Sequence, residues 1–158
     1  MTKRLFSLLA NSKFSSTWIP ENLPEGPVVD LGCGNGIVSR MLGSSVKRKI
    51  ICVDRREGAL VATREQMRGL THTTLLSDVC FLGIRDKTCS LVFASRIFSN
   101  VKDKELLLKE SMRVLKNKGY LIVIDSEKCL NFFKKRKLSF SSFKSPKKMI
   151  AIALKKGI

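Results

Sequence analysis

The sequence predicts an α/β protein with a mostly parallel sheet, and three patterns support this prediction. Short apolar runs alternate with helical segments along most of the chain, which is the order of strand–helix–strand units. The apolar runs are continuous rather than alternating, as expected for strands that are covered on both faces. A glycine-rich turn at 32–36 follows the first run and leads into a helical segment.

Five apolar runs are predicted as strands of this sheet, at 27–31, 49–54, 73–76, 90–95 and 120–125. Three segments between them have apolar residues at helical spacing, at 36–43, 57–67 and 103–115. In the second of these helices, the residues predicted to share one side are Leu60, Val61, Arg64 and Met67. In the third, Asp103 is the candidate N-cap and Gly119 follows the expected end.

The composition changes at Ser126. From there to the last residue the chain has ten Lys and Arg and one acidic residue, so this part carries +9 of the formal net charge of +17. We predict a helix over 127–135 and then two strands, over 138–143 and 149–154, joined by a turn near Ser145. A hairpin added to the edge of the parallel sheet is the simplest arrangement.

The chain is interpreted as a single domain of 158 residues, a length typical of one domain. Residues 1–26 are predicted as a lead-in with a short N-terminal docking helix, 27–125 as the core, and 126–158 as a basic C-terminal helix and hairpin. No apolar run approaches the ~18 residues of a membrane span, so no membrane partner is expected. The apolar part of the N-terminal segment is too short for a signal peptide.

The charge balance narrows the classes of partner. The 30 Lys and Arg residues against 13 Asp and Glu exclude an acidic-tail protein and make a polyanion a candidate partner, with mere solubility as the alternative. The five cysteines are odd in number and have no C-x-x-C spacing, which argues against a zinc site and a disulfide framework. We therefore expect reduced cysteines, no bound metal and a cytoplasmic protein.

The most informative segment is Val-Val-Asp-Leu-Gly-Cys-Gly-Asn-Gly at 28–36. Its glycines allow positive φ angles and a close ligand, and the following helix N-terminus favours a negative or hydrogen-bond-accepting group. Ile37 stands where the dinucleotide fingerprint has its third glycine, and no G-K-[S/T] of a phosphate-binding loop follows. Asp30 can face the ammonium of a ligand that carries a free amino acid, or can simply order the loop.

Two further acidic residues follow the next strands. Asp54 ends the second strand, where a carboxylate can accept hydrogen bonds from both hydroxyls of a ribose. Asp78 lies just past the third strand, where it can accept from the exocyclic amine of adenine beside an apolar contact from Val79, or can cap a turn. Because the carboxyl ends of parallel strands meet at one edge of the sheet, the three acids are expected to line one crevice.

Taken in order, these motifs resemble those of class I S-adenosylmethionine-dependent methyltransferases of the broad type-11 kind. The matching segments are motif I at 28–36, motif II at 51–54, the stretch from the adenine-binding acid to the fourth strand at 78–92, and an R-V-L-K-P-G-G-x-L-like segment at 110–121. The resemblance covers residues 28–125. The chain departs from the family pattern at 89–90 and 117–119, positions that do not contact the cofactor in that pattern.

The resemblance implies a Rossmann-like methyltransferase fold: a mostly parallel seven-stranded sheet with helices on both faces. It also implies an antiparallel strand beside the fifth, which suits the predicted C-terminal hairpin. The implied cofactor is S-adenosyl-L-methionine, whose methyl group the protein would transfer to an acceptor. The implied cofactor-binding residues are Asp30, Gly32, Cys33, Gly34, Asp54, Arg55, Asp78, Val79 and Ser95.

The acceptor site is expected at the end of the fourth strand, with acceptor-side candidates Ser95, Arg96 and Asn100. Methyl transfer depends mainly on the alignment of donor and nucleophile, so no catalytic base is assigned. Asp125 is a weak candidate for a general base. A catalytic role for the single histidine, His72, is disfavoured. The [D/N/S]-P-P-[Y/F/W] motif of enzymes that methylate base amines is absent, and so is the Pro-Cys of pyrimidine C5 methyltransferases.

RNA is a candidate acceptor, because the C-terminal segment combines Lys and Arg for phosphates with aromatic side chains for stacking on bases, namely Phe132, Phe133, Phe140 and Phe143. The alternative is that these side chains form a hairpin core under a solvated basic face. A small-molecule or protein acceptor and a non-catalytic methyltransferase-like subunit remain as alternative functions. The lack of a separate lid suits a large acceptor, or a site completed in a homodimer or by a partner subunit.

Overall fold

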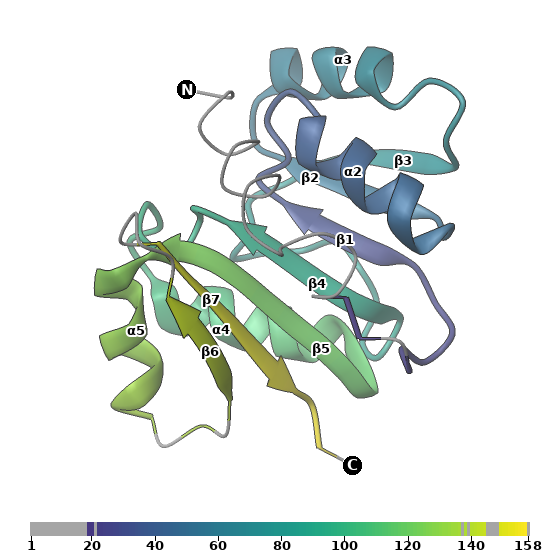
Figure 1. The fold of residues 1–158 in the computed structure, drawn as a ribbon. Helices are drawn as coiled ribbons and strands as arrows, with labels where there is room; N and C mark the ends of the chain where they lie inside the picture. The colour runs from purple at the N-terminus through teal and green to yellow at the C-terminus, as the bar shows by residue number, and fades with distance from the viewer. Residues whose placement is uncertain (1–18, 21, 137, 139, 145–148, 158) are drawn as a thin grey trace.

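The structure is a computed structural model that describes residues 19–20, 22–136, 138, 140–144 and 149–157. One seven-stranded sheet has the strand order β3-β2-β1-β4-β5-β7-β6 (Figure 1). The strands are β1 (Val28–Leu31), β2 (Ile50–Asp54), β3 (His72–Leu76), β4 (Cys89–Ser95), β5 (Leu115–Ser126), β6 (Ser141–Lys144) and β7 (Met149–Lys155). The helices are α2 (Ile37–Val46), α3 (Glu57–Gln66), α4 (Lys104–Val114) and α5 (Glu127–Lys134).

The order of the parallel strands reverses next to the glycine-rich segment. From β1, the chain adds β2 and β3 on one side, and β4 and β5 on the other. Leu31, the last residue of β1, pairs with Val53 of β2 and with Ala94 of β4. Such a reversal opens a crevice outside the carboxyl ends of the strands. The predicted mostly parallel sheet is confirmed, and its order reverses at β1, which leads into the glycine-rich segment.

Helices cover both faces of the sheet, as predicted (Figure 1). On one face, Leu42 of α2 packs in a buried cluster with Val28. On the other face, Leu107 of α4 and Phe133 of α5 pack with Val29. Because neighbouring residues of β1 point to opposite buried faces, apolar residues are adjacent along the strand, with Asp30 as the exception.

Helix α4 begins as predicted but ends earlier than expected. Asp103 caps its first turn by accepting a hydrogen bond from the backbone nitrogen of Leu106 at 2.9 Å. The helix ends at Val114, and the chain passes directly into β5. Gly119 is therefore an inner residue of a long strand, and the prediction that it follows a helix end as a terminator is wrong.

A close backbone approach explains why position 119 is glycine. A Cβ atom on Gly119 would lie 2.9 Å from the carbonyl oxygens of Ser90 and Lys116, a distance that side chains do not tolerate. The pairing of β4 with β5 shifts its register between Cys89 and Leu91, beside this contact. The glycine thus permits an irregular strand pairing, which is a common role of glycine within sheets.

The C-terminal hairpin joins the sheet as predicted. Strand β7 pairs antiparallel with β5, from Tyr120 opposite Lys155 to Ser126 opposite Met149, and also pairs antiparallel with β6. Strand β6 begins at Ser141, three residues later than expected. The expected turn near Ser145 and the expected N-terminal helix lie outside the described residues.

All five cysteines are free and buried, as expected for small apolar side chains. Burial raises the pKa of Cys33 and of Cys89 to about 12, so these thiols stay protonated at neutral pH. Within the described ranges, no group of side chains has the arrangement of a metal site. None of the helices in this part of the chain is long and apolar enough to cross a membrane.

Candidate functional site

The loop between β1 and α2 turns on three glycines in the left-handed region. The φ angles of Gly32, Gly34 and Gly36 are 66°, 57° and 79°. A Cβ atom on Gly32 would lie 2.1 Å from Cδ1 of Ile97, and one on Gly36 would lie 2.8 Å from Cα of Thr63. A Cβ atom on Gly34 would meet nothing within 4 Å. Two glycines therefore permit close packing of the loop, while the middle one faces open space that a ligand can enter.

Thr63 of α3 holds this loop through its side chain, a role that the sequence did not predict. Its hydroxyl donates to the carbonyl oxygen of Gly34 at 3.0 Å, and its Oγ1 lies 3.5 Å from Sγ of Cys33. Thr63 is fully buried, whereas Val61, which was predicted to share one side of the helix with Leu60, is 52% exposed. A threonine three residues after Leu60 was the only available signal, because helical spacing puts both on one face.

Asp54 ends β2 beside the open glycine. Its Oδ2 accepts from the backbone nitrogen of Gly34 at 3.0 Å, and its Oδ1 accepts from the backbone nitrogen of Arg56 at 3.0 Å and from Nε of Arg56 at 3.3 Å. Burial alone would raise the pKa of Asp54, but the hydrogen bonds from Arg56 and Gly34 outweigh it and hold the pKa below its usual value. A charged carboxylate is thus available at this position at neutral pH.

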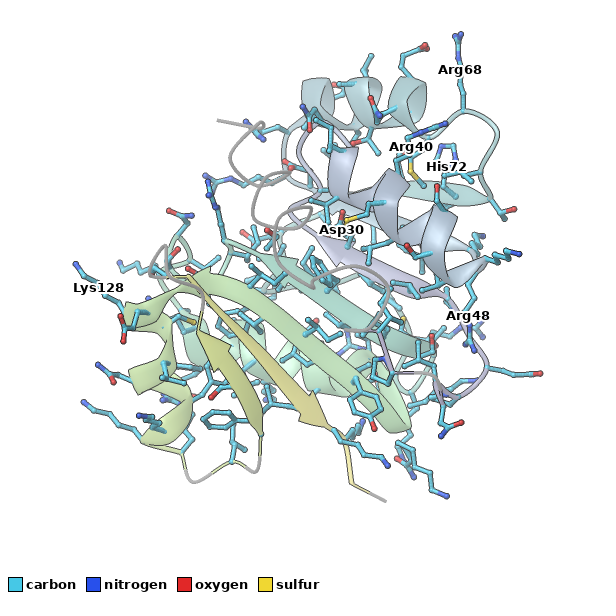
Figure 2. All side chains as sticks on the ribbon, viewed as in Figure 1. Asp30, Arg40, Arg48, Arg68, His72 and Lys128 are labelled. Atoms are coloured by element: carbon cyan, nitrogen blue, oxygen red, sulfur yellow. The ribbon has the colours of Figure 1, made fainter. Side chains whose placement is uncertain are left out.

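Asp30 lies in the interior of the fold, at the centre of β1 (Figure 2). Its Oδ2 accepts from the hydroxyl of Ser39, on α2, at 2.6 Å. Burial raises the pKa of Asp30 to about 7, partly opposed by the Ser39 hydrogen bond and supported by the nearby charge of Asp54. A nearby cation would favour the ionised form of this carboxyl group and lower its pKa.

Asp78 lies in the β3–β4 loop, which runs from residue 77 to residue 88. Its Oδ1 accepts from the backbone nitrogen of Cys80 at 2.8 Å, so the side chain does cap a turn. Asp78 is nevertheless exposed, while Val79 is half-buried against the core. The capping role and a ligand-facing role are compatible, since one carboxylate has about four acceptor sites.

The end of β4 lies against the glycine loop, because Ile97 occupies the space that a side chain at Gly32 would need. The backbone nitrogen of Arg96 donates to the carbonyl oxygen of Ile124 at 2.7 Å, and Nδ2 of Asn100 donates to the carbonyl oxygen of Arg96 at 2.6 Å. Arg96 has a φ angle of 57°, unusual for a residue with a side chain. These contacts fix the backbone of the expected acceptor side.

Asp125, at the end of β5, also holds this segment. It is 1% exposed, and its two oxygens accept from the backbone nitrogens of Ser99 at 3.0 Å and Ser126 at 2.6 Å. These bonds give the carboxylate an anchoring role, which argues against its use as a general base.

The structure brings most of the expected cofactor residues to one edge. Residues from the ends of β1, β2 and β4 and from the β3–β4 loop meet at the carboxyl side of the sheet. Ser95 is half-buried at the last position of β4, and Arg55 is exposed just after β2. His72 starts β3 at the opposite edge, where its Nδ1 lies 2.9 Å from the carbonyl oxygen of Leu70 (Figure 2).

Comparison with known proteins identifies the family. The model of a family described as "Methyltransferase domain" matches residues 29–123, more than half of the chain. The chain belongs to this methyltransferase family. The match begins in β1, ends in β5 and includes all the expected cofactor-binding residues.

Two curated relatives are similar in sequence to this methyltransferase domain. The glycine/sarcosine/dimethylglycine N-methyltransferase of Actinopolyspora halophila is 30% identical over 106 residues, which is 65% of this chain and 19% of that protein. The human mitochondrial arginine-hydroxylase NDUFAF5 is 31% identical over 104 residues, which is 66% of this chain and 29% of that protein. The chain thus matches less than a third of the length of either relative.

Solved structures share the fold. The plantazolicin methyltransferase BpumL in complex with SAH has a TM-score of 0.75 at 12% identity, covering 96% of this chain and 84% of that one. A candidate methyltransferase in complex with the Trm112 methyltransferase activator of Haloferax volcanii has a TM-score of 0.74 at 13% identity, covering 98% of this chain and 94% of that one. The Rossmann-like methyltransferase fold is therefore confirmed.

The residues present fit the cofactor of this family, S-adenosyl-L-methionine. The open space at Gly34 admits a ligand against the backbone, and the charged Asp54 beside it is an acceptor for hydroxyl groups. Asp30 is a second carboxyl group near the end of β1, 1% exposed and bonded to Ser39, and a nearby ammonium group would favour its ionised form. The donor and acceptor types at this edge match a ligand that combines an amino acid with a nucleoside.

Proposed function

We propose that this protein is an S-adenosyl-L-methionine-dependent methyltransferase. The observation that carries the proposal is the charged Asp54 carboxylate held beside the open Gly34 backbone, at the reversal point of the sheet. In this proposal Asp54 binds the ribose hydroxyls, Asp78 accepts from the adenine amine beside Val79, and Asp30 faces the amino-acid end. When bound, the cofactor supplies an activated methyl group on a positively charged sulfur.

The main contribution of the chain to this reaction is to position the methyl donor and the acceptor. The segment after β4 is fixed by Ile97 against Gly32 and by the backbone bond from Arg96, so an acceptor bound there would be held close to the glycine loop. Alignment of a donor and a nucleophile can supply a large part of a rate acceleration. A nucleophile that carries no proton needs no general base, which agrees with the commitment of Asp125 to backbone nitrogens.

We propose RNA as the acceptor, and charge is the support for this choice. The formal net charge is +17, and Lys128 and Lys134 are exposed on α5, with Lys128 at the periphery in Figure 2. Lys135 is exposed just after the helix. Arg96 lies on the expected acceptor side and forms no ion pair with another described residue. A guanidinium there is suited to a phosphate.

The aromatic part of the RNA hypothesis needs correction. The ring of Phe133 is fully buried and lies 5.1 Å from the rings of Phe98 and Phe132, centroid to centroid. The half-buried ring of Phe140 lies 6.3 Å from that of Phe133, and the guanidinium of Arg136 lies 3.4 Å above the ring of Phe132. Phe133 thus lies in the core and Phe132 and Phe140 pack against it, while the side chain of Phe143 lies outside the described set.

A small amine is the second candidate acceptor. Its support is the sequence similarity to an N-methyltransferase named for glycine, sarcosine and dimethylglycine.

A partner protein is a further candidate requirement, supported by the shared fold with a protein in complex with a methyltransferase activator. The two exposed apolar side chains nearest the end of β3, Leu76 and Phe81, are 57% and 69% exposed and would suit such a contact.

The five free cysteines favour a reducing compartment such as the cytoplasm.

One experiment separates these candidates. The purified protein is incubated with S-adenosyl-L-methionine labelled at the methyl group and with a cell extract separated into RNA, protein and metabolite fractions. Asp54→Ala serves as the control for transfer by other enzymes in the extract. Label in RNA supports the proposal, and label in metabolites or protein alone replaces RNA as the acceptor. Label in no fraction contradicts methyl transfer by the isolated chain and favours a partner-dependent or non-catalytic subunit.

A further inference from the structure

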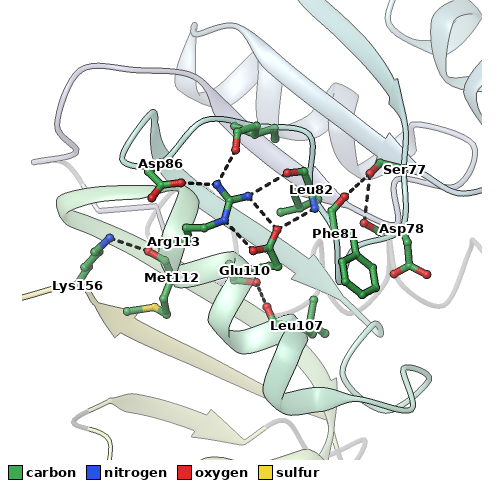
Figure 3. Close-up of polar contacts among 12 residues, drawn as sticks. Ser77, Asp78, Phe81, Leu82, Asp86, Leu107, Glu110, Met112, Arg113 and Lys156 are labelled. Carbon is green, nitrogen blue, oxygen red and sulfur yellow. Dashed lines mark hydrogen bonds and ion pairs between the residues drawn. The ribbon is translucent and has the colours of Figure 1, made fainter.

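Arg113, near the end of α4, directs its whole guanidinium group at the β3–β4 loop and at its neighbour Glu110 (Figure 3). Its Nη1 donates to the carbonyl oxygen of Ile84 at 2.8 Å and to Asp86 at 2.5 Å. Its Nη2 donates to the carbonyl oxygen of Leu82 at 2.9 Å and to Glu110 at 2.8 Å, and its Nε donates to Glu110 at 2.7 Å. One side chain thus joins three residues of the loop to the helix.

Glu110 completes the attachment. Its Oε2 accepts from the backbone nitrogen of Leu82 at 2.9 Å, so both backbone groups of Leu82 are bonded to side chains of α4. The hydrogen bonds from Arg113 lower the pKa of Glu110 despite its partial burial, which keeps this carboxylate charged. The pair therefore remains ionised over the neutral range, and its hydrogen bonds are charge-assisted.

Leu82 is joined by a tight turn to the residue expected to recognise adenine (Figure 3). The backbone nitrogen of Phe81 donates to the carbonyl oxygen of Asp78 at 3.0 Å, and the hydroxyl of Ser77 donates to the carbonyl oxygen of Phe81 at 2.8 Å. At the other end, the backbone nitrogen of Ser77 donates to the carbonyl oxygen of Asp54 at 3.1 Å. The turn is held on β2 at its start and on α4 at its end.

The loop has further contacts with the start and the end of α4. The Sγ of Cys80 lies 3.6 Å from the carbonyl oxygen of Asp103, and the backbone nitrogens of Lys87 and Thr88 donate to the carbonyl oxygens of Arg113 and Val114 at 3.0 Å and 2.9 Å. It contains neither helix nor strand, and its buried side chains are those of Cys80 and Leu82. Without Arg113, the carbonyl oxygens of Leu82 and Ile84 would lose charged donors, and Glu110 would hold the turn through the backbone nitrogen of Leu82. A lysine could not replace the arginine fully, because one ammonium group cannot reproduce the planar array of donors.

We propose that Arg113 is a positioning residue that sets the orientation of Asp78 and Val79, and thereby the selectivity of the site for a 6-amino purine. This inference rests on the proposed function, because it assigns Asp78 to the exocyclic amine of the cofactor. Arg113 acts through the loop and touches no ligand. Its loss should therefore change which purine is preferred, more than it changes binding of the ribose and amino-acid parts.

The test compares two ligands that differ only at this purine position. S-adenosylhomocysteine carries the 6-amino group, and S-inosylhomocysteine carries an oxygen there. Titration calorimetry gives both dissociation constants for the wild type, Arg113→Ala, Arg113→Lys and Lys109→Ala, the last being an exposed cation removed from the same helix. We expect the wild type and Lys109→Ala to prefer the amino ligand by about tenfold or more, the range for a hydrogen bond to a charged group.

In Arg113→Ala this preference should fall to about threefold or less, because the charged hydrogen bond between Asp78 and the 6-amino group would be lost. Arg113→Lys should restore the preference in part. Equal weakening of both ligands in Arg113→Ala, with the preference unchanged, overturns the proposal and leaves a general structural role. If Arg113→Ala does not fold, Glu110→Gln is measured by the same two titrations and judged by the same criterion. Failure of the wild type to bind either ligand contradicts the proposed function itself, and is thus distinguishable.

Discussion

Removal of the Asp54 carboxylate should weaken cofactor binding by an amount that the structure allows us to work out. The two oxygens of Asp54 have about four acceptor sites, and the fold uses three of them for Gly34 and Arg56. One site is free for a ribose hydroxyl. A second becomes free if the Arg56 side chain, which is 69% exposed, turns away into solvent and leaves the 6% exposed side chain of Asp54.

The expected magnitude follows from these sites. A hydrogen bond to a charged group contributes about 1.5–3 kcal/mol. Some of the gain from two ribose hydrogen bonds is offset by the displaced Arg56 contact, so the net loss in Asp54→Ala should stay in this range. That corresponds to an increase of about 10- to 150-fold in the dissociation constant of S-adenosylhomocysteine. Asp54→Asn keeps an acceptor for Gly34 but loses the charge, so its loss should be smaller.

Calorimetric titration with S-adenosylhomocysteine measures the effect, and Arg56→Ala is the matched control. That variant removes the exposed cation but keeps the carboxylate, so its affinity should stay within about threefold of the wild type. Circular dichroism before each titration checks that the variants are folded. Binding by Asp54→Ala within twofold of the wild type would refute the assignment of this carboxylate to the ribose.

Three further predictions concern other parts of the site. The pKa of Asp30 is about 7 in the folded protein against 3.8 in the unfolded chain, so protonation favours the fold. The free energy of unfolding should therefore fall by up to about 4 kcal/mol as the pH rises from 4 to above 7. Urea denaturation of Asp30→Asn should lack this fall, and the same pH dependence in both proteins would contradict the prediction. Arg96→Gly should keep or raise thermal stability, because glycine relieves a left-handed backbone, and should lower kcat/KM for RNA about tenfold or more, because it removes the acceptor-side cation. The control Lys118→Gly, at a residue with a φ angle of 64°, should leave kcat/KM unchanged. Equal losses of kcat/KM in both variants would count against the acceptor assignment. Thr63→Val should lose about 1–3 kcal/mol of unfolding free energy, because the Gly34 carbonyl loses its buried donor; an unchanged urea midpoint would show that the hydroxyl does not hold the loop.

Local patterns were sufficient for the sheet and for the glycine loop. Each acid that ends or follows a strand, such as Asp54 after 50–53, contrasts with the apolar run before it, and parallel topology then brings the strand ends together. The same reasoning placed Asp103 as an N-cap, because its side chain needs only the nitrogen of Leu106 three residues later. These features depend on neighbours in sequence or on a regular topology.

The features that the sequence did not predict depend on contacts between distant segments. Gly119 is required by the carbonyl oxygen of Ser90 on another strand, so its local setting after a helix was misleading. Thr63 bonds a loop that lies 29 positions earlier, and Arg113 bonds Ile84 at the same separation. No spacing rule relates such pairs, because their proximity exists only after the sheet and helices have assembled.

The central claim, that this methyltransferase domain binds its cofactor at the glycine loop and the β3–β4 loop, is tested most directly by amide NMR during a titration with S-adenosylhomocysteine. We expect saturable shifts of the backbone amides of Gly34 and Val79, at sub-millimolar ligand, with little change at Lys134 on α5. The absence of saturable shifts at millimolar ligand would contradict the account, and so would shifts confined to α5 and the hairpin.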